Sequence, residues 1–552
     1  MTNALLDYEK VYREFSWDTY MNQYLDWPGN GYFNITHEAI DRHAEDPKKV
    51  AIFYISADGR EEKYTFREMK NLTSQHANML RNLGVEKGDS VARMLPRSIE
   101  NYITFLGTWK AGAIDVPVFT AYGPEALEYR AKSSKIKMLI TDAENRPKVE
   151  RISGGLPGVK IVVVSGPKGE GLQAGDYDYW KELSGASRQF DTARMKADDV
   201  MLVHYTSGTT GAPKGAMINE KGAMFMIPFS LYSLSLKKDD MFWGFADPGW
   251  IYALFTVGTS VLIAGGSLLV YGGRMDAENW YNIMDKYEVT NFAAAPTLYR
   301  MIMAAGDDLA KSYKESVKAW RYTSAGEYLD PKVSQWFKEK FGVGISDQYG
   351  LTEVGIVLGN YPFMLEKPGS MGRPVPGFEV RVLEKEGNAV AHGETGIVMV
   401  KKNDFFLGCG YLNEPARWQE CFVNGEWYNT GDMAVMDDDG YFFYMGRDDD
   451  IISSSGYRIG PAEVEGAVMK HPSVAEVAAV GKPDPLRTEN VVVFVVLKSG
   501  HEPSAELAEE IQKQVKSSYA AHIYPREVEF VSELPKTESG KIMRRELRKR
   551  FQ

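Results

Sequence analysis

Short apolar segments that alternate with helical ones constrain the fold of this chain more than any other sequence feature. An apolar run at residues 91–95 is followed by apolar side chains at helical spacing over 99–106 and by a second apolar run at 113–118. Further runs at 137–142 and 160–165 are each followed by turn residues. Strands that alternate with helices form a mostly parallel sheet with both faces covered. The sequence therefore predicts an α/β fold.

The pattern changes after residue 378. Alternating and aromatic segments separated by Asn, Asp and Gly turns follow up to residue 447 and are typical of antiparallel strands. Three adjacent carboxylates, Asp448 to Asp450, repel one another, so we expect them to stay solvated as a linker. Beyond them lie a helix opened by Pro461, two apolar strands and an amphipathic helix. We predict a large domain over residues 1–448, with mostly parallel α/β subdomains and a β subdomain, and a small α+β domain over 449–552.

Composition excludes several classes of protein. The 552 residues carry 64 Lys and Arg against 75 Asp and Glu, and a net charge of −11 argues against a nucleic-acid binder. Two cysteines rule out a disulfide scaffold and a Cys-rich metal site. The longest purely aliphatic or aromatic run, Val491 to Leu497, is too short for a membrane span, which needs about 20 residues. No basic segment followed by an apolar stretch opens the sequence, so we expect a cytoplasmic protein. We also expect it to be a monomer or a homodimer.

The strongest chemical signal is a string of glycines and hydroxyl residues over 205–216, directly after an apolar strand. Consecutive N–H and O–H groups beside one lysine form a phosphate cradle. The string is not a Walker A loop, because Gly215 rather than Ser or Thr follows the lysine. A plain surface loop is the alternative, and the length of the string disfavours it. The candidate phosphate-binding residues are Thr206, Ser207, Gly208, Thr209, Thr210, Gly211 and Lys214.

This string resembles the signature of the adenylate-forming superfamily, which includes acyl-CoA synthetases, firefly luciferases and the adenylation domains of peptide synthetases. Further matches recur in the order of the family over roughly residues 200–545. Within the superfamily the chain looks most like the acetyl- and medium-chain acyl-CoA synthetases. The resemblance implies ATP, Mg²⁺ and coenzyme A as cofactors, a small carboxylate as substrate, and a C-terminal domain that moves.

Two downstream segments match those that flank the adenine and the α-phosphate in the family. The resemblance implies that Gly326, Glu327 and Tyr328 line the base. The nucleotide-binding residues that it implies in the second segment are Asp347, Gln348, Tyr349, Gly350 and Leu351. It also implies that Thr352 bonds the α-phosphate and that Glu353 holds Mg²⁺, for which a carboxylate is a suitable hard ligand. An N-capping element is the alternative for an isolated Thr-Glu pair.

Asp432 and Arg447 form the third set of candidate nucleotide-binding residues. A carboxylate accepts two hydroxyl hydrogen bonds, so Asp432 suits a ribose diol, and the family uses an arginine at the position of Arg447 on the same sugar. A turn aspartate is the alternative for Asp432, because Thr-Gly-Asp is common in turns.

The C-terminal part carries the second diagnostic string, residues 534–544, in which Lys541 matches the catalytic lysine of the family. A carboxylate that approaches an anionic α-phosphate meets like charge, so a bridging cation is needed; at 4 Å it contributes roughly 4 kcal/mol at an effective dielectric of 20. The resemblance also implies that Asp449 is the hinge of the domain motion, unless it is only an exposed acidic turn.

Five more residues follow from the resemblance alone. Ser455 belongs to a loop that would face the active site during thioester formation, Gly456 would leave room for the pantetheine arm, and Arg458 would meet a nucleotide phosphate. Lys516 would bind a CoA phosphate. A solvated helix lysine is the alternative for Lys516. His471 matches a structural metal position, although one histidine without other ligand side chains is more typical of a satisfied surface residue.

The segment around Trp250, Ile251 and Tyr252 matches the acyl-pocket segment of the family. The resemblance implies that these three residues line the pocket together with Ala325 and Gly350. In acetate-specific relatives a tryptophan closes the pocket at the position of Gly350, so we expect a deeper pocket here and a short- to medium-chain acid longer than acetate. Tyr252 is larger than the threonine of the acetate enzymes and works against this expectation. Branched, aromatic and unsaturated acids all remain open.

Two other functions remain as alternatives. One is an adenylating enzyme that passes its acyl group to a carrier-protein thiol, or oxidises it as a luciferase does. The segment at 455–458 and a chain that ends at 552 without a carrier domain favour free CoA. The other is a non-catalytic nucleotide-binding protein, which would require a defect in a motif, and the motif strings show none.

Overall fold

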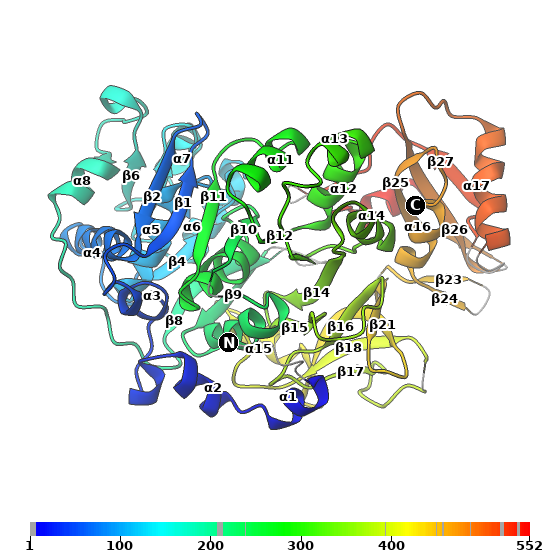
Figure 1. Cartoon of the computed structure of the whole chain (residues 1–552), viewed down its shortest axis with the longest axis horizontal. Helices are drawn as coiled ribbons and strands as arrows, with labels where there is room; N and C mark the ends of the chain where they lie inside the picture. Colours follow the sequence, from blue (N-terminus) through cyan, green and yellow to red (C-terminus); the bar gives the residue numbers. More distant parts are fainter. Residues whose placement is uncertain are drawn as a thin grey trace. The chain divides into compact units, whose positions relative to one another are not determined.

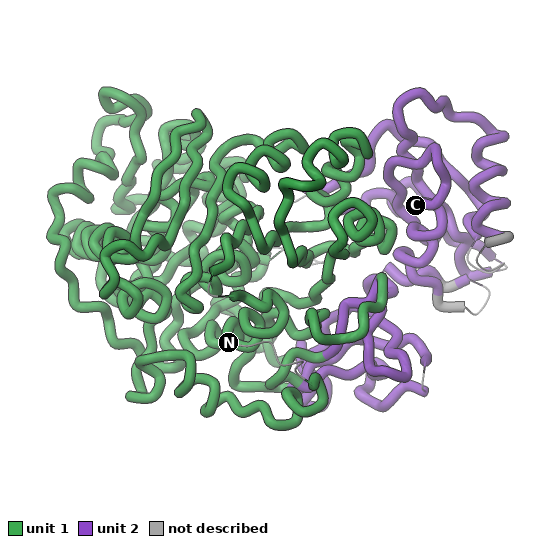
Figure 2. The backbone as a smooth tube through the Cα atoms, viewed as in Figure 1, with its two compact units in different colours: residues 1–368, 374–378, 402–420 green, residues 369–373, 379–401, 421–552 purple. Residues whose placement is uncertain are grey.

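The computed structural model describes residues 7–206, 213–237, 239–391, 393–448, 450–454, 457–485, 487–518, 524–537 and 541–551. They belong to two compact units (Figure 2). Unit 1 comprises residues 1–368, 374–378 and 402–420, and unit 2 comprises 369–373, 379–401 and 421–552. Among the described residues, no helix has both the length and the apolar character that a membrane crossing requires.

The first sheet of unit 1 confirms the predicted α/β pattern. Its strands follow the order β19-β9-β8-β4-β3-β5-β6-β7, parallel from β8 to β7. Figure 1 labels β4, β6, β8 and β9 of this sheet. They are Gly408–Tyr411 (β19), Lys214–Asn219 (β9), Val200–Thr206 (β8), Ile114–Pro117 (β4), Ser90–Met94 (β3), Met138–Asp142 (β5), Lys160–Val164 (β6) and Tyr177–Asp178 (β7). The accompanying helices include Phe66–Asn82 (α4), Ile99–Lys110 (α5), Pro124–Ser133 (α6), Arg146–Ser153 (α7) and Tyr179–Gly185 (α8).

A second set of strands in unit 1 carries the segments expected around the base. It follows the order β15-β14-β13-β12-β10-β11-β1-β2 and is parallel except at its two ends. The strands are Gly355–Gly359 (β15), Ile345–Leu351 (β14), Arg321–Ala325 (β13), Asn291–Ala294 (β12), Met241–Phe245 (β10), Ser267–Tyr271 (β11), Val50–Ile55 (β1) and Glu61–Thr65 (β2). Other helices of unit 1 are Tyr8–Glu14 (α1), Trp17–Tyr24 (α2), Ile35–Ala39 (α3), Met226–Pro228 (α9), Ser260–Ile263 (α10), Ala277–Lys286 (α11), Pro296–Ala304 (α12), Asp307–Ser312 (α13), Pro331–Phe341 (α14) and Pro415–Gln419 (α15).

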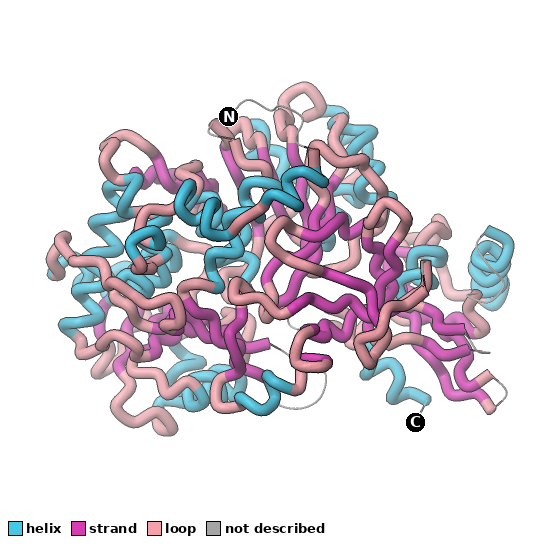
Figure 3. Tube along the Cα trace, turned by 90° about the horizontal axis from the view of Figure 1, so that it is seen from below, coloured by secondary structure: helices cyan, strands magenta, loops and turns pink. Residues whose placement is uncertain are grey.

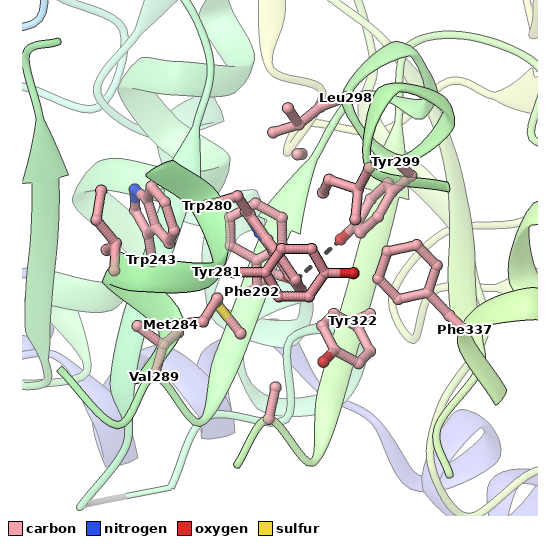
Figure 4. Packing of buried hydrophobic residues seen from close by; sticks show 14 of the residues in the cluster. Trp243, Trp280, Tyr281, Met284, Val289, Phe292, Leu298, Tyr299, Tyr322 and Phe337 are labelled. Carbon is pink, nitrogen blue, oxygen red and sulfur yellow. Dashed lines mark hydrogen bonds between the residues drawn. The ribbon is translucent and has the colours of Figure 1, made fainter. Parts of the chain in front are cut away.

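An aromatic core fixes α11, α12 and α14 to these strands. Trp280, Tyr299 and Phe337 of the helices pack against Phe292 of β12 and Tyr322 of β13 (Figure 4). All five side chains are fully buried. Burial of such a side chain stabilises the fold by about 1.5–3 kcal/mol. The core therefore holds the carboxyl ends of β13 and β14, where Ala325 and Gly350 lie, in a fixed place.

Unit 2 contains the predicted antiparallel strands. Those before the linker follow the order β17-β18-β21-β22-β16, and β20 also pairs with β21. They are Val380–Leu383 (β17), Gly396–Lys401 (β18), Trp427–Met436 (β21), Phe442–Arg447 (β22), Ser370–Pro374 (β16) and Phe422–Val423 (β20). Thr430 to Asp432 lie within β21 rather than in a turn, with Gly431 at a φ of 71°.

The C-terminal part of unit 2 is a sheet with two helices on one face and a third on the other. Its strands are Tyr457–Ile459 (β24), Ile452–Ser454 (β23), Thr488–Leu497 (β26), Val474–Asp484 (β25) and Glu527–Phe530 (β27), and its helices are Pro461–Val468 (α16), Ala505–Ser518 (α17) and Arg544–Arg548 (α18). Val493 of β26 packs with α16 and α17, whereas its neighbour Phe494 packs with Leu547 of α18. Figure 3 shows the strands between the longer helix and the short helix beside the C-terminus.

The linker differs from its prediction at Asp450. We expected three solvated carboxylates, but the Asp450 side chain is only 14% exposed and pairs with Arg544 and Arg548 of α18. The prediction was wrong because the two partners lie about a hundred positions further along the chain, beyond any local pattern. Asp449 lies outside the described residues, and the domain boundary there stays a prediction.

Candidate active site

The two ends of the glycine-rich loop are held together by the β8–β9 pair. Thr206 is the last residue of β8, Lys214 is the first of β9, and the two are register partners. Ser207, Gly208, Thr209, Thr210 and Gly211 lie outside the described residues. The described flanks therefore bring one hydroxyl and one cation to the same end of the sheet, as a phosphate cradle requires.

Glu353 connects this loop to the turn between β14 and β15. Its carboxylate is 7% exposed, and Oε1 accepts hydrogen bonds from the Tyr411 hydroxyl at 2.8 Å and from Thr206 Oγ1 at 3.5 Å. Lys214 Nζ donates to the Tyr411 hydroxyl at 3.3 Å and lies 4.8 Å from the centre of its ring. The structure thus joins Thr206 and Lys214 of the predicted phosphate loop to Glu353, which was predicted from another segment, in one network.

Tyr411 is the member of this network that the sequence analysis missed. It is 1% exposed and ends β19, which pairs with β9. A tyrosine after two glycines carries no chemical signal by itself, so only the pairing of β19 with the loop strand reveals its place.

The carboxylate of Glu353 fits a magnesium ion. Both described hydrogen bonds end on Oε1, so Oε2 would be the ligand atom. Mg²⁺ is usually bound by one or two carboxylates together with substrate phosphates. Thr352 is half-buried in the same turn, one residue closer to β14.

The predicted base segment after β13 is positioned by α12. Glu327 accepts hydrogen bonds from Thr297 Oγ1 at 2.7 Å and from Arg300 Nη2 at 2.8 Å. Gly326 has a φ of 95°, and a Cβ there would lie 3.7 Å from the ring of Trp250. The base segment and the acyl segment therefore meet at Gly326, and the half-buried Tyr328 follows two residues later.

Two buried polar side chains on β14 fit a ligand in the same region. Asp347 Oδ1 and both amide atoms of Gln348 are buried and have no hydrogen-bond partner among the described residues. Buried polar groups are normally paired, so a nucleotide base or water is the expected partner. Burial raises the pKa of Asp347 well above its usual value.

The close approach of β15 changes the meaning of Gly350. Tyr349 and Gly350 flank an irregularity in the β14–β15 register, and Leu351 ends β14. A Cβ at Gly350 would lie 2.2 Å from the carbonyl oxygen of Gly355. We expected the missing side chain at Gly350 to leave a cavity. This expectation is wrong, because the β15 backbone fills the space that a side chain at Gly350 would occupy.

The acyl segment is tied to β8 by a buried histidine. His204 Nε2 lies 2.9 Å from the Gly249 carbonyl oxygen, next to Trp250, and burial lowers the pKa of His204 to about 4. The ring is therefore neutral at neutral pH and donates to Gly249. His204 was not singled out in the sequence, although a histidine in an otherwise apolar strand is a signal.

Tyr252 and its neighbours form the rest of the predicted pocket wall. Tyr252 and Ala325 are buried, whereas Ile251 is half-buried. Burial, followed by the charge of Asp347, raises the pKa of the Tyr252 hydroxyl. The structure therefore places the acyl segment beside the residues expected at the base.

Asp432 and Arg447 are register partners across β21 and β22. Arg447 Nη1 donates to Asp432 Oδ1 at 3.2 Å and to the Thr430 carbonyl oxygen at 2.9 Å. The predicted spacing thus brings the pair into contact. A Cβ at Gly431 would lie 2.8 Å from the Arg447 guanidinium, so glycine is required beside it.

The remaining predicted residues lie in the C-terminal part of unit 2. Ser455 and Gly456 are outside the described residues, and the Arg458 backbone belongs to β24. Lys516 is an exposed residue of α17 whose Nζ lies 5.3 Å from the Tyr524 ring centre. Lys541 is exposed.

His471 lies just after α16. Its Nδ1 accepts from the Ser473 N–H at 3.4 Å, its Nε2 is 3.9 Å from Glu510, and burial lowers its pKa. Within the described ranges, no group of three or more His, Cys, Asp or Glu side chains gathers as a metal site would require.

Comparisons with known proteins agree with this geometry. The family model of the AMP-binding enzyme matches residues 40–412, and that of the AMP-binding enzyme C-terminal domain matches residues 463–541. Acetyl-coenzyme A synthetase of Bacillus subtilis is 40% identical over 99% of this chain and 95% of its own length. The human mitochondrial acyl-coenzyme A synthetase ACSM5 is 35% identical over 94% of this chain and 90% of its own.

The chain is also similar to solved structures of an acyl-CoA synthetase and a CoA ligase. The Brucella canis acyl-CoA synthetase has a TM-score of 0.77 and 38% identity and covers 99% of both chains. The anthranilate CoA ligase AuaEII, in complex with anthranoyl-AMP, has a TM-score of 0.85 and 31% identity over 94% of this chain and 97% of its own. The chain belongs to the AMP-binding enzyme family of adenylate-forming enzymes. Within it, the chain is an acid–thiol ligase of the AMP-forming acyl-CoA synthetase type.

Proposed function

We propose that this enzyme joins a carboxylic acid longer than acetate to coenzyme A through an acyl-adenylate. The acid attacks the α-phosphate of Mg-ATP, the bond to the β-phosphate breaks, and diphosphate leaves. The thiol of CoA then attacks the acyl carbonyl, gives its proton to solvent, and AMP leaves. The observation that supports the proposal is the network of Thr206, Lys214, Glu353 and Tyr411, which brings hydroxyl groups, an ammonium group and a carboxylate together at one end of the sheet, a set that suits phosphate and Mg²⁺.

Lys541 supplies the cation for the first step in this proposal. Its side chain bridges the carboxylate and the α-phosphate, two anions that otherwise repel each other. Its exposure on the C-terminal part fits a group that has to reach a ligand. Rotation at Asp449 then withdraws Lys541 and brings Gly456 and Arg458 to the reaction centre, so that one pocket serves both steps.

The remaining candidate residues bind the nucleotide and coenzyme A in this proposal. Asp432 and Arg447 bind the ribose, which suits a carboxylate and a guanidinium already in contact. Thr352 bonds the α-phosphate, and Lys516 binds a phosphate of CoA. The preference for an acid longer than acetate rests on Ala325, whose small side chain leaves room in the pocket wall, and not on Gly350.

The test measures the two half-reactions separately in the variant Lys541→Ala. Exchange of ATP with diphosphate should fall by about 10²–10³, as expected for loss of an electrostatic group at a developing charge. Thioester formation from supplied acyl-adenylate should stay nearly unchanged. Lys536→Ala, which removes a lysine of the same segment that pairs with Glu476, is the control and should retain both activities. An equal loss of both half-reactions in Lys541→Ala would contradict the role of Lys541.

A panel of carboxylic acids, followed by diphosphate release, tests the acyl chain. Acids with more carbons should react with a higher kcat/KM than acetate, because each buried methylene adds about 0.8 kcal/mol. Highest activity with acetate would overturn this part of the proposal and leave the reaction type intact. Exchange without a thioester on addition of CoA would instead indicate transfer to a carrier protein.

A further inference from the structure

The described residues on either side of position 539, which include Lys541, are bonded to each other. Thr537 N–H donates to the Lys541 carbonyl oxygen at 2.7 Å, and Lys541 N–H donates to Thr537 Oγ1 at 3.1 Å. Lys536 and Ile542 form a β-bridge, and Met543 N–H donates to the Pro535 carbonyl oxygen at 2.8 Å. We call the described residues 535–537 and 541–543 the lysine loop. Helix α18 begins directly after it.

The first residue of α18 is anchored by two carboxylates. Arg544 makes a bidentate pair with Glu465 of α16, with both oxygens 2.8 Å from Nη2, and its Nη1 lies 3.6 Å from Asp450 Oδ2. The exposed fractions of these side chains are 20% for Arg544, 12% for Glu465 and 14% for Asp450. A bidentate pair with little solvent contact holds its geometry better than a surface pair.

Asp450 has a second partner on the same helix. Arg548 Nη2 donates to Asp450 Oδ1, one turn after Arg544. The carboxylate thus receives one guanidinium at each oxygen. The linker residue is therefore joined by its side chain to the helix that continues the lysine loop.

The backbone of the linker makes a different connection. The N–H groups of Asp450 and Ile451 both donate to the Arg447 carbonyl oxygen at 3.0 Å, at the end of β22. These two bonds cross the predicted pivot at residue 449, whereas the bonds between Asp450 and α18 lie wholly on its C-terminal side. A rotation at the pivot therefore breaks the first set and leaves the second intact.

We propose that Asp450, Arg544 and Arg548 are positioning residues that make the linker and the lysine loop a single rigid body. Dihedral changes before Asp450 are then transmitted directly to Lys541, instead of being absorbed between the linker and the loop. The proposal rests on the proposed function, because it requires Lys541 to act in the first half-reaction. A purely structural role of the same residues would stabilise the domain and affect both half-reactions equally.

The experiment compares Asp450→Asn with the matched control Glu527→Gln in the full-length enzyme. Glu527 is paired with Lys482 in the same domain at 2.7 Å and is far more exposed, at 40%. We expect Asp450→Asn to lower ATP–diphosphate exchange by about 10-fold or more, since a small misplacement of a reacting group has a large effect on rate. Thioester formation from supplied acyl-adenylate should change by less than about twofold, as should both activities of Glu527→Gln.

Two further variants complete the test. Asp450→Glu, which keeps the charge, should recover part of the lost exchange. Arg548→Gln should reduce ATP–diphosphate exchange but not thioester formation. Combining it with Asp450→Asn should lower exchange little further, because both substitutions remove the same contact.

Parallel loss of both half-reactions in Asp450→Asn, or exchange equal to that of the parent enzyme, would overturn the positioning role. If Lys541→Ala itself leaves exchange intact, the proposed function fails instead, so the two failures are distinguishable.

Discussion

The described partners of Glu353 are hydroxyl groups, and this suits a magnesium ligand. Tyr411 and Thr206 hold the carboxylate by hydrogen bonds without neutralising its charge. Lys214 reaches the Tyr411 hydroxyl and not the carboxylate itself in the described contacts. In the proposed function this carboxylate binds Mg²⁺, and the two hydrogen bonds fix its orientation.

Tyr411→Phe tests this arrangement. Loss of a hydrogen bond to a charged group costs about 1.5–3 kcal/mol, so the rate of adenylation should fall by about 10-fold or more. The Mg²⁺ concentration for half-maximal exchange should rise as well, and a magnesium titration measures both effects. Tyr313→Phe, which removes a surface hydroxyl that donates to Asn282 at 2.6 Å, is the control. An unchanged magnesium dependence would exclude Tyr411 from the ion site.

Single residues could be predicted from sequence where they lie in distinctive strings. Asp432 and Arg447 were predicted in this way, and the structure brings them into contact. Tyr411 and the partners of Asp450 could not be predicted, because their contacts join segments that are distant in sequence and carry no local motif. Gly350 was misinterpreted because a sequence shows a missing side chain but not the strand that occupies its space.

At the scale of elements, α16 approaches β22 at a point where only glycine fits. A Cβ at Gly460 would lie 2.0 Å from the Met445 carbonyl oxygen, although the φ of −72° at Gly460 suits any residue. Pro461 is also close to β22, since a Cβ at Gly446 would be 2.9 Å from its Cδ. The glycine at 460 is therefore required by packing and not by backbone conformation.

Gly460→Ala should loosen the contact between α16 and β22. A Cβ under 3 Å from backbone atoms forces the two elements apart, so the N–H groups of Asp450 and Ile451, which bond to the end of β22, should exchange with deuterium about 10-fold faster. The amides of β25 and β26 should keep their protection. Gly154→Ala, at a glycine with a normal φ of −63° and open space around it, is the control. Equal exchange in variant and parent would contradict the packing requirement.

Regular elements were the most predictable part of the fold. The strands β3 to β6 begin and end within about a residue of the apolar runs, and α16 begins at Pro461 as predicted. Local periodicity is sufficient for such elements because both faces are buried. The Thr-Gly-Asp segment was harder to interpret, since its glycine has the left-handed conformation of a turn but lies inside β21.

For the molecule as a whole, buried neutral histidines link stability to pH. Burial lowers the pKa of His204 to about 4 and that of His76 to about 3 in the folded protein. In the unfolded chain both titrate near 6.5. Between these values the unfolded state binds more protons than the folded state, so the free energy of unfolding falls as the pH is lowered through this window.

His204→Gln should weaken this dependence. Glutamine keeps an N–H donor for the Gly249 carbonyl but does not titrate, so the loss of stability between pH 6.5 and 4 should decrease by up to about 1.4 kcal/mol per pH unit. Denaturant unfolding at a series of pH values measures the slope. An identical slope in His204→Gln and the parent would show that His204 is not the titrating group.

The division of the chain into units could not be predicted from the order of its segments. Residues 369–373 belong to unit 2 because Ser370 of β16 pairs with Phe443 of β22, more than seventy positions later. Strand pairing over such distances depends on register and packing, which a single sequence does not display.

The register of β21 and β22 limits how the length of this segment can vary. Side chains alternate between the two faces of a strand, so a one-residue insertion between Asp432 and the end of β21, or between the start of β22 and Arg447, would turn one partner to the opposite face. The same insertion in the turn at 437–441 leaves both strands in place. Length changes in related chains should therefore accumulate in the turn and be excluded from the strand ends that hold the pair.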